Sequence, residues 1–197
     1  HFNYTDVPME LRPLQDPHPP LWYPSSNPDG SKYAGENGFH YCTLGGVEMA
    51  KANIAAYREA YEKRGSTVGA QRPFPGGAAI GISRQVTVAE TDAEALKIAG
   101  PAYKVWHDSL TKLWRDNNVE GPSFARNTVD TVEKAIAGGA HIAGSPETVR
   151  QQIAEQIDAL GVNYLVMAFN IGDMAHEDAL RSITLFGEEV MPMLADL

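Results

Sequence analysis

The sequence predicts an α/β fold whose strands run parallel. Two observations support this prediction: apolar runs of strand length alternate with helical segments, and each run ends in a polar or glycine-rich turn. We expect four strands, at residues 21–23, 39–44, 78–88 and 164–169. A helix between consecutive strands implies parallel pairing, because antiparallel neighbours need only a hairpin. The order of helix, glycine, strand, polar turn and helix is typical of a parallel barrel or a doubly wound sheet.

Length and composition limit the possible classes of protein. The chain of 197 residues is 43% hydrophobic, enough for a single domain, 1–197, with a sizeable core. Its net charge of −9 argues against nucleic acid or an anionic membrane as a partner, since both attract clustered Lys and Arg. We expect no membrane span and no signal peptide, because no apolar run approaches about 18 residues and no basic-then-apolar leader opens the chain. The single cysteine excludes an internal disulfide and fits a reducing compartment, so we expect a cytoplasmic protein.

The first sixteen residues are expected to form an extended arm or a small β-ribbon. Apolar and aromatic residues alternate there with polar ones, while Pro8 and Pro13 interrupt the pattern and disfavour a central strand. Because Phe2-Asn3-Tyr4 already has this alternation, we expect the chain to begin inside a larger fold, as a processed product or a fragment.

Helices are predicted from hydrophobic spacing and from capping residues. The stretch 47–64 places apolar or small residues three and four apart and is followed by a glycine. Thr91 and Glu94 form a capping box that begins the next helix. We expect that helix to break at Gly100-Pro101, because proline removes a helical hydrogen bond.

The C-terminal part is predicted to contain two further helices and one strand. The stretch 117–140 has little periodicity and is interpreted as an irregular insertion with one short helix. Ser145, followed by proline, is a helix start, and that helix should run to residue 160. After the last strand, a final helix is expected over 175–194.

The turn after the first strand is the best candidate for a binding site. Small polar residues follow the strand at once, and a short helix is expected at 32–37. Unpaired amides at a helix start and nearby hydroxyls can point at one phosphate group. The candidate cofactor-binding residues are Ser25, Ser26, Asn27, Gly30 and Ser31. The same residue types are common in ordinary turns, so a plain loop is the alternative.

Other catalytic constellations are not supported by the sequence. The histidines lack the spacing of metal ligands, so no metal site is expected. There is no Gly-x-Ser-x-Gly elbow for a Ser-His-Asp triad and no Gly-x-Gly-x-x-Gly fingerprint for a dinucleotide. Cys42 is expected to be a small core residue rather than a nucleophile. Trp22 and Tyr23 could stack on a flat cofactor or simply pack in the core.

Five motifs occur in order along nearly the whole chain. The first motif combines Phe2-x-Tyr4-x-x-Val7 with the nearby Pro13-Leu14-Gln15-x-Pro17-His18-Pro19-Pro20-Leu21-Trp22. The second motif is Ser26-Asn27-Pro28-Asp29-Gly30-Ser31. The other three are Arg84-x-x-x-Val88-Ala89-Glu90-Thr91, Gly144-Ser145-Pro146-Glu147 and Gly172-Asp173-x-x-His176-Glu177. Together they resemble the luciferase-like, flavin-dependent monooxygenases.

The resemblance implies part of a TIM (β/α)8 barrel of the bacterial luciferase-like type, with this chain supplying strands five to eight. In that family reduced FMN, usually delivered by a separate flavin reductase, reacts with O2 and oxidises an aldehyde, sulfonate, alkane or ring substrate. Relatives with a deazaflavin cofactor transfer hydride on the same fold.

The resemblance also implies a role for the turn after the first strand. By position, Ser26, Asn27 and Gly30 match the family's loop after the fifth barrel strand, which helps to hold the flavin phosphate, and Ser25 and Ser31 are adjacent. The loop of bacterial luciferase reads acidic-Ser-x-x-Thr. In this chain Ser26 stands at the acidic position and Gly30 at the threonine position.

The chain resembles only the C-terminal half of the family's barrel. The first four strands would carry the residues around the flavin ring and most of the catalytic ones, so no catalytic residue is named. Four strands alone leave an open edge on each side, with unpaired backbone and apolar surface. We expect a second copy, the missing half or disorder to cover these edges.

The leading interpretation is therefore the C-terminal portion of a flavin-dependent monooxygenase acting on a small organic substrate and O2. The alternatives are a non-catalytic flavin-binding barrel half that dimerises, a deazaflavin-dependent hydride-transfer oxidoreductase, and a phosphate-binding α/β module. Loops 66–76 and 117–140 would help to set the substrate.

Overall fold

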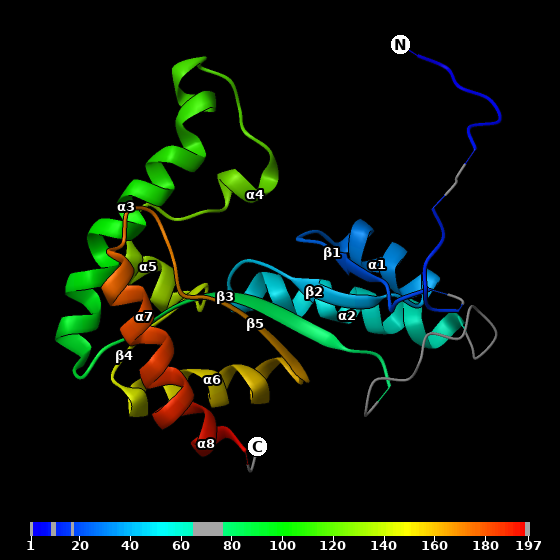
Figure 1. The fold of residues 1–197 in the computed structure, drawn as a ribbon. Coiled ribbons are helices and arrows are strands. Elements are labelled where there is room, and N and C mark those ends of the chain that lie inside the picture. The colour runs from blue at the N-terminus through cyan, green and yellow to red at the C-terminus, as the bar shows by residue number, and fades with distance from the viewer. Residues whose placement is uncertain (1, 9–10, 17, 65–76, 196–197) are drawn as a thin grey trace.

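Five parallel strands form the sheet at the centre of the chain (Figure 1). The computed structural model describes residues 2–8, 11–16, 18–64 and 77–195. The strands in these residues are β1 (Trp22–Pro24), β2 (His40–Thr43), β3 (Ile80–Val88), β4 (His141–Gly144) and β5 (Tyr164–Ala168). The predicted α/β class and parallel pairing are confirmed, and β1, β2, β3 and β5 lie where the apolar runs predicted them.

β3 is the central strand because it pairs with three others. Its residues 80–82 pair with β2, residues 81–85 with β5 and residues 85–88 with β4. Gly81 is shared between β2 and β5, and Gln85 between β4 and β5. Therefore β2 and β4 lie along one edge of β3 and β5 lies along the other. Since β1 pairs with β2, the described strands follow the order β1-β2-β3-β5, with β1 and β5 at the two ends.

The sheet is strongly curved. In a flat sheet β1 and β5 would be three strand spacings apart, about 14 Å. The ring of Trp22 in β1 nevertheless lies 4.7 Å from that of Tyr164 in β5, between centroids, and 5.1 Å from that of His40 in β2. These three rings, the aromatic cluster, meet across the concave face at the amino ends of their strands. The curvature is that of a sheet rolled part of the way into a barrel.

Helices cover the convex face and the carboxyl end of the sheet (Figure 1). They are α1 (Pro28–Asn37), α2 (Val47–Arg64), α3 (Asp92–Asp116), α4 (Ser123–Arg126), α5 (Val132–Ala137), α6 (Pro146–Leu160), α7 (His176–Leu185), the π-helical turn η1 (Phe186–Val190) and α8 (Met191–Leu194). On the convex face, Ile54 of α2 and Leu160 of α6 are buried with Ile82 of β3 in one apolar cluster. Burial of this kind is the main favourable term in folding.

Two predictions about longer segments were wrong. The helix predicted to break at Gly100-Pro101 is continuous. Ala99 and Ala102, on either side of the expected break, are 0% and 2% exposed, so both halves of the helix pack against the rest of the protein. The insertion 117–140 contains two short helices, α4 and α5, rather than one.

Two short elements also differ from the prediction. β4 was not predicted, because its sequence His-Ile-Ala-Gly has no apolar alternation and becomes a strand only by pairing with β3. α1 begins at Pro28 instead of residue 32, since Asn27 caps it and proline suits the first helical position.

The N-terminal arm is exposed. Its described residues, 2–8 and 11–16, contain no helix or strand, and Phe2, Leu11 and Leu14 are each at least 90% exposed. The β-ribbon therefore stays a prediction for this segment.

α1 packs closely on α2 through a glycine. A Cβ atom at Gly35 would lie 2.5 Å from the carbonyl oxygen of Tyr57 and 2.9 Å from the Cβ of Ala60. Because the nearest obstacle is backbone, it cannot move aside as a flexible side chain would. Gly35 thus sets the separation of the two helices.

We expect Gly35→Ala to lower the free energy of unfolding by about 1–3 kcal/mol, measured by denaturant titration, because overpacking outweighs the better helix propensity of alanine. Gly100→Ala in α3 is the matched control, since its nearest neighbour would be Val132 Cγ1 at 3.9 Å. That control should leave stability unchanged or raise it. Equal effects of the two substitutions would contradict this account of the α1–α2 contact.

His141 is a buried, neutral histidine between β3 and α3. It is 0% exposed, with Nε2 3.2 Å from Thr87 Oγ1 and Nδ1 3.4 Å from Gln85 Oε1. The ring of Tyr103 meets it edge-on. Burial lowers the pKa of His141 to about 4, so the folded protein holds it uncharged at neutral pH.

Protonation of His141 should therefore destabilise the fold in acid. Below its ordinary pKa of 6.5 the unfolded chain takes up a proton that the folded chain refuses. This contribution to stability is complete above pH 6.5 and falls by about 1.4 kcal/mol per pH unit towards pH 4. The measurement is denaturant unfolding of wild type and His141→Gln over this pH range. If the free energy of unfolding changes with pH in the same way in both proteins, His141 is not the group responsible.

Candidate functional site

The carboxyl ends of the parallel strands form one rim, and the chain's polar turns gather there. Ser25 directly follows β1, Gly45 lies just beyond β2, and α3 begins just after β3. In curved parallel sheets with helices on the convex side, ligands bind at this rim. The rim is therefore where the predicted residues are assessed.

The five predicted residues lie together in the turn between β1 and α1. The Ser25 backbone N–H donates to the Cys42 carbonyl at 3.0 Å, which ties the turn to β2. Asn27 caps α1, its Oδ1 accepting from the Gly30 N–H at 2.9 Å. One of the free amides of the helix start is thus already used by the protein itself.

Two of the three serine hydroxyls point into the turn. Ser25 Oγ donates to the Asn27 carbonyl at 3.1 Å and accepts from the Asn27 N–H at 3.3 Å. A Cβ at Gly30 would lie 2.3 Å from Ser25 Oγ, so glycine makes room for this hydroxyl. Ser31 is 0% exposed and lies 2.7 Å from the Asn27 carbonyl and 2.6 Å from the hydroxyl of Tyr41.

Ser26 is the serine of the three whose donors are not used within the turn. Among the described residues, neither its hydroxyl nor its backbone N–H has a hydrogen-bond partner, and the same holds for the backbone N–H of Asp29. Donors of this kind at the start of a ten-residue helix are the groups that bind a phosphate in other proteins. The exposed Asp29 carboxylate in the same turn opposes an anion and reduces the net attraction. Phosphate binding by the five residues stays a prediction.

The concave face combines aromatic, small and polar side chains. The aromatic cluster lies at the amino end, strand alternation places Cys42, Gly81 and Ser83 on the same face, and Gln85 and His141 follow nearer the rim. His40 Nδ1 accepts from the Ala79 N–H at 3.0 Å, which places a proton of the neutral ring on Nε2. Burial lowers the pKa of His40, so it is uncharged at neutral pH. Trp22, predicted to stack on a cofactor or to pack, packs at a tilt against the rings of His40 and Tyr164.

Cys42 is protonated at neutral pH. Burial raises the pKa of its thiol, and the side chain is half-buried on the concave face. A thiol in this state is a weak nucleophile, which agrees with the predicted packing role.

Arg84, which the sequence analysis named only as part of a family motif, is a buried cation. It is 1% exposed, its Nε donates to Gln156 Oε1 at 2.7 Å, and its Nη1 donates to the Ser83 carbonyl at 2.8 Å. Nη2 has no partner within the described residues. Burial lowers its pKa to about 10, so it stays charged. Because Gln156 is on α6, Arg84 faces the convex side and stabilises the layer between sheet and helix rather than the rim.

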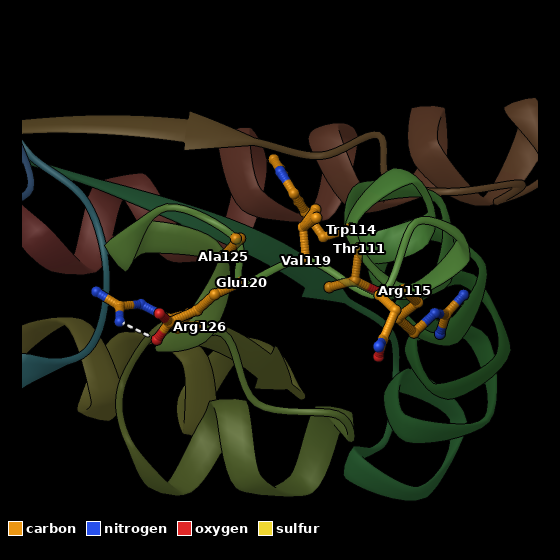
Figure 2. Close-up of a pocket in the computed structure, with 9 residues that line it drawn as sticks. Thr111, Trp114, Arg115, Val119, Glu120, Ala125 and Arg126 are labelled. Carbon is orange, nitrogen blue, oxygen red and sulfur yellow. Dashed lines mark hydrogen bonds and ion pairs between the residues drawn. The ribbon is translucent and has the colours of Figure 1, made fainter.

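A cavity of about 450 Å³ lies between the end of α3 and the insertion 117–140 (Figure 2). Trp114 and Val119 give it apolar walls, and Glu120 and Arg126 form an ion pair beside it. This is the insertion that was predicted to help set the substrate. The other such loop, 66–76, lies outside the described residues.

Metal ions and membranes have no evident site in the described part of the chain. No three His, Cys, Asp or Glu side chains there are grouped to hold a metal. Likewise, none of its helices combines the length and apolarity that a membrane crossing needs.

The sequence matches a family model and several curated proteins, among them the following two. The model, described as luciferase-like monooxygenase, matches residues 1–164. The uncharacterised protein y4wF of Sinorhizobium fredii (strain NBRC 101917 / NGR234) is 26% identical over 191 residues, 97% of this chain and 53% of that protein. The 2,5-diketocamphane 1,2-monooxygenase 2 of Pseudomonas putida is 24% identical over 177 residues, 85% of this chain and 47% of that protein.

Solved structures share the fold. Monooxygenase RslO1 from Streptomyces bottropensis has a TM-score of 0.69 at 22% identity, over 95% of this chain and 52% of its own. The oxygenating constituent of 3,6-diketocamphane monooxygenase from Pseudomonas putida, in complex with FMN, has a TM-score of 0.61 at 22% identity. The match covers 87% of this chain and 47% of that chain. The coenzyme F420-dependent tetrahydromethanopterin reductase from Methanopyrus kandleri has a TM-score of 0.56 at 17% identity. The match covers 88% of this chain and 50% of that chain.

The chain spans about half the length of the relatives it matches, and its curved parallel sheet is that of a partial barrel. Since the family model covers residues 1–164 of 197, the chain belongs to the luciferase-like monooxygenase family.

Proposed function

We propose that this chain is the C-terminal portion of a flavin-dependent monooxygenase that uses reduced FMN and O2 on a small organic substrate. Membership of the luciferase-like family carries the proposal, and the unused donors of the β1–α1 turn support it. A flavin reductase would supply the reduced cofactor, and the single cysteine keeps the cytoplasm as the expected compartment.

The chain's own residues would bind and shield the cofactor. The Ser26 hydroxyl and the N–H groups of Ser26 and Asp29 would hold the phosphate at the rim. The aromatic cluster would line the amino end of the concave face. When bound, the flavin supplies the oxygen chemistry, while the protein supplies position and electrostatics. The catalytic residues are proposed to lie in the part of the barrel that this chain does not span.

Deazaflavin-dependent hydride transfer is the second candidate, because an F420-dependent reductase shares the fold. Titration with FMN and with F420 compares the two cofactors directly. Binding of neither cofactor would overturn both candidates and favour a phosphate-binding module. Oxygen uptake with NADH and a flavin reductase, measured on this chain and on a longer barrel-length protein, then separates a catalytic from a non-catalytic role.

Ser26→Asp should weaken FMN binding by about tenfold or more, because a new carboxylate repels the phosphate. Ser26→Ala removes one donor and should cost about two- to fivefold. The measurement is the dissociation constant from quenching of flavin fluorescence. Ser109→Asp, at an exposed position on α3, controls for the added charge and should have little effect. Equal losses for Ser26→Asp and Ser26→Ala would indicate a plain turn.

A further inference from the structure

We propose that Tyr41 is a positioning residue for the β1–α1 turn: its hydroxyl holds the Ser25 carbonyl and thereby directs the Ser26 N–H towards the bound phosphate. This inference rests on the proposed function, because the turn is the proposed phosphate site. It adds a residue of β2, outside the turn, that acts on the ligand only through the backbone of Ser25 and Ser26.

The Tyr41 side chain lies in the layer between sheet and helices. It is 0% exposed and belongs to the convex-side cluster with Ala34 of α1 and Ile54 of α2. Its ring stacks on that of Tyr57, with centroids 4.7 Å apart and an interplanar angle of 13°. Because residues of this chain bury the ring completely, its contact with the turn does not depend on what covers the concave face.

The Tyr41 hydroxyl is a hydrogen-bond donor beneath the turn. It donates to the Ser25 carbonyl at 3.1 Å and lies 2.6 Å from the Oγ of Ser31. Burial raises the pKa of the Tyr41 hydroxyl, so it keeps its proton at neutral pH. The chain leaves the sheet at this point: the Ser25 N–H still donates to the Cys42 carbonyl of β2, whereas the Ser25 carbonyl turns to the Tyr41 side chain.

The Ser25 carbonyl depends on this one donor. The neighbouring Asn27 carbonyl accepts from the Ser31 N–H and from Ser25 Oγ, each at 3.1 Å. By contrast, the Ser25 carbonyl accepts only from Tyr41 within the described residues. Ser25 is 8% exposed. Removal of the hydroxyl would therefore leave a nearly buried carbonyl without a partner and favour rotation of that peptide group towards water.

Planarity of the peptide bond passes this constraint on to Ser26. In a trans peptide the carbonyl of one residue and the N–H of the next point in opposite directions. The Ser25 carbonyl points into the convex-side layer, towards Tyr41. The Ser26 N–H therefore points away from that layer, towards the concave side, where the flavin is proposed to bind. This N–H has no partner in the described part of the chain, so it can donate to an anion.

Tyr57 provides a matched control for the loss of a buried phenol hydroxyl. Like Tyr41 it is 0% exposed, and its hydroxyl donates to one backbone carbonyl, that of Phe39, at 2.7 Å. Phe39 precedes β2 and is therefore at the opposite end of the strands from the β1–α1 turn. Phenylalanine at either position keeps an aromatic ring in the stacked pair. A difference in ligand binding between the two variants therefore reports the place of the hydroxyl and not a loss of stability.

Tyr41→Phe should raise the dissociation constant of FMN by about five- to tenfold, because one amide no longer faces the phosphate. The constant for riboflavin, which has the same ring system and no phosphate, should change by less than about twofold. Tyr57→Phe should change neither constant by more than about twofold. The constants come from quenching of flavin fluorescence, measured on variants whose circular dichroism matches that of the wild type.

Nuclear magnetic resonance of the wild type tests the same geometry without a substitution. Addition of inorganic phosphate should shift the Ser26 amide resonance more than that of Ser25, whose N–H is bonded to the Cys42 carbonyl. In Tyr41→Phe the shift at Ser26 should fall by at least about half. A wild-type Ser26 amide that does not respond to phosphate would overturn the proposal, even if Tyr41→Phe fails to fold.

The flavin measurements separate this proposal from the proposed function. If the wild type binds FMN no more tightly than riboflavin, the phosphate is not held and both proposals fail. If the wild type prefers FMN and Tyr41→Phe keeps the full preference, only the positioning role of Tyr41 is wrong. Equal losses for the two flavins in Tyr41→Phe, or equal FMN losses in Tyr41→Phe and Tyr57→Phe, would indicate a general structural effect and would also overturn that role.

Discussion

The pairing of β3 with three other strands is the constraint on which the rest of the structure depends. Parallel neighbours cannot be joined by hairpins, so each connection must cross over one face of the sheet. α2 and α6 make these crossings on the convex face and bury β3 side chains such as Ile82 and Val86 to 1% exposure. On the other face, α3 and α5 cover the β4 end of the sheet, where Tyr103 meets His141 and Ala143 packs with Ala95. Tyr164 and Val166 of β5 stay partly exposed on that face.

The curvature of the sheet gives its two faces different side chains. On the convex side, the buried guanidinium of Arg84 is held by Gln156 and a carbonyl, where its charge links sheet and helix. On the concave side, the aromatic cluster lies at the amino end, and Gly81 and Ser83 of β3 carry little or no side chain. The β1–α1 turn lies at that rim, next to the space a flat cofactor would need. The same curvature therefore brings the aromatic cluster together at the amino ends of the strands and places the β1–α1 turn at their carboxyl ends.

The candidate site was only partly predictable from sequence. The five residues do share one turn, because turn composition and helix capping are local properties. The direction of each hydroxyl is not local. Ser31 is turned inward by Tyr41, ten positions away on β2, and Ser25 is packed against Gly30. Sequence therefore identified the turn, whereas the fold determined that Ser26 presents the free hydroxyl.

The same division holds for the fold. Sequence alone determined α2, whose predicted limits agree with Val47–Arg64, since hydrophobic spacing and a following glycine act within a few residues. It also determined four parallel strands, because their apolar runs are local. Only the tertiary structure decided that β4 exists and that α3 continues through Pro101, since both depend on packing partners far along the chain. The curvature that joins Trp22 to Tyr164 is likewise a property of paired strands, and no local pattern encodes it.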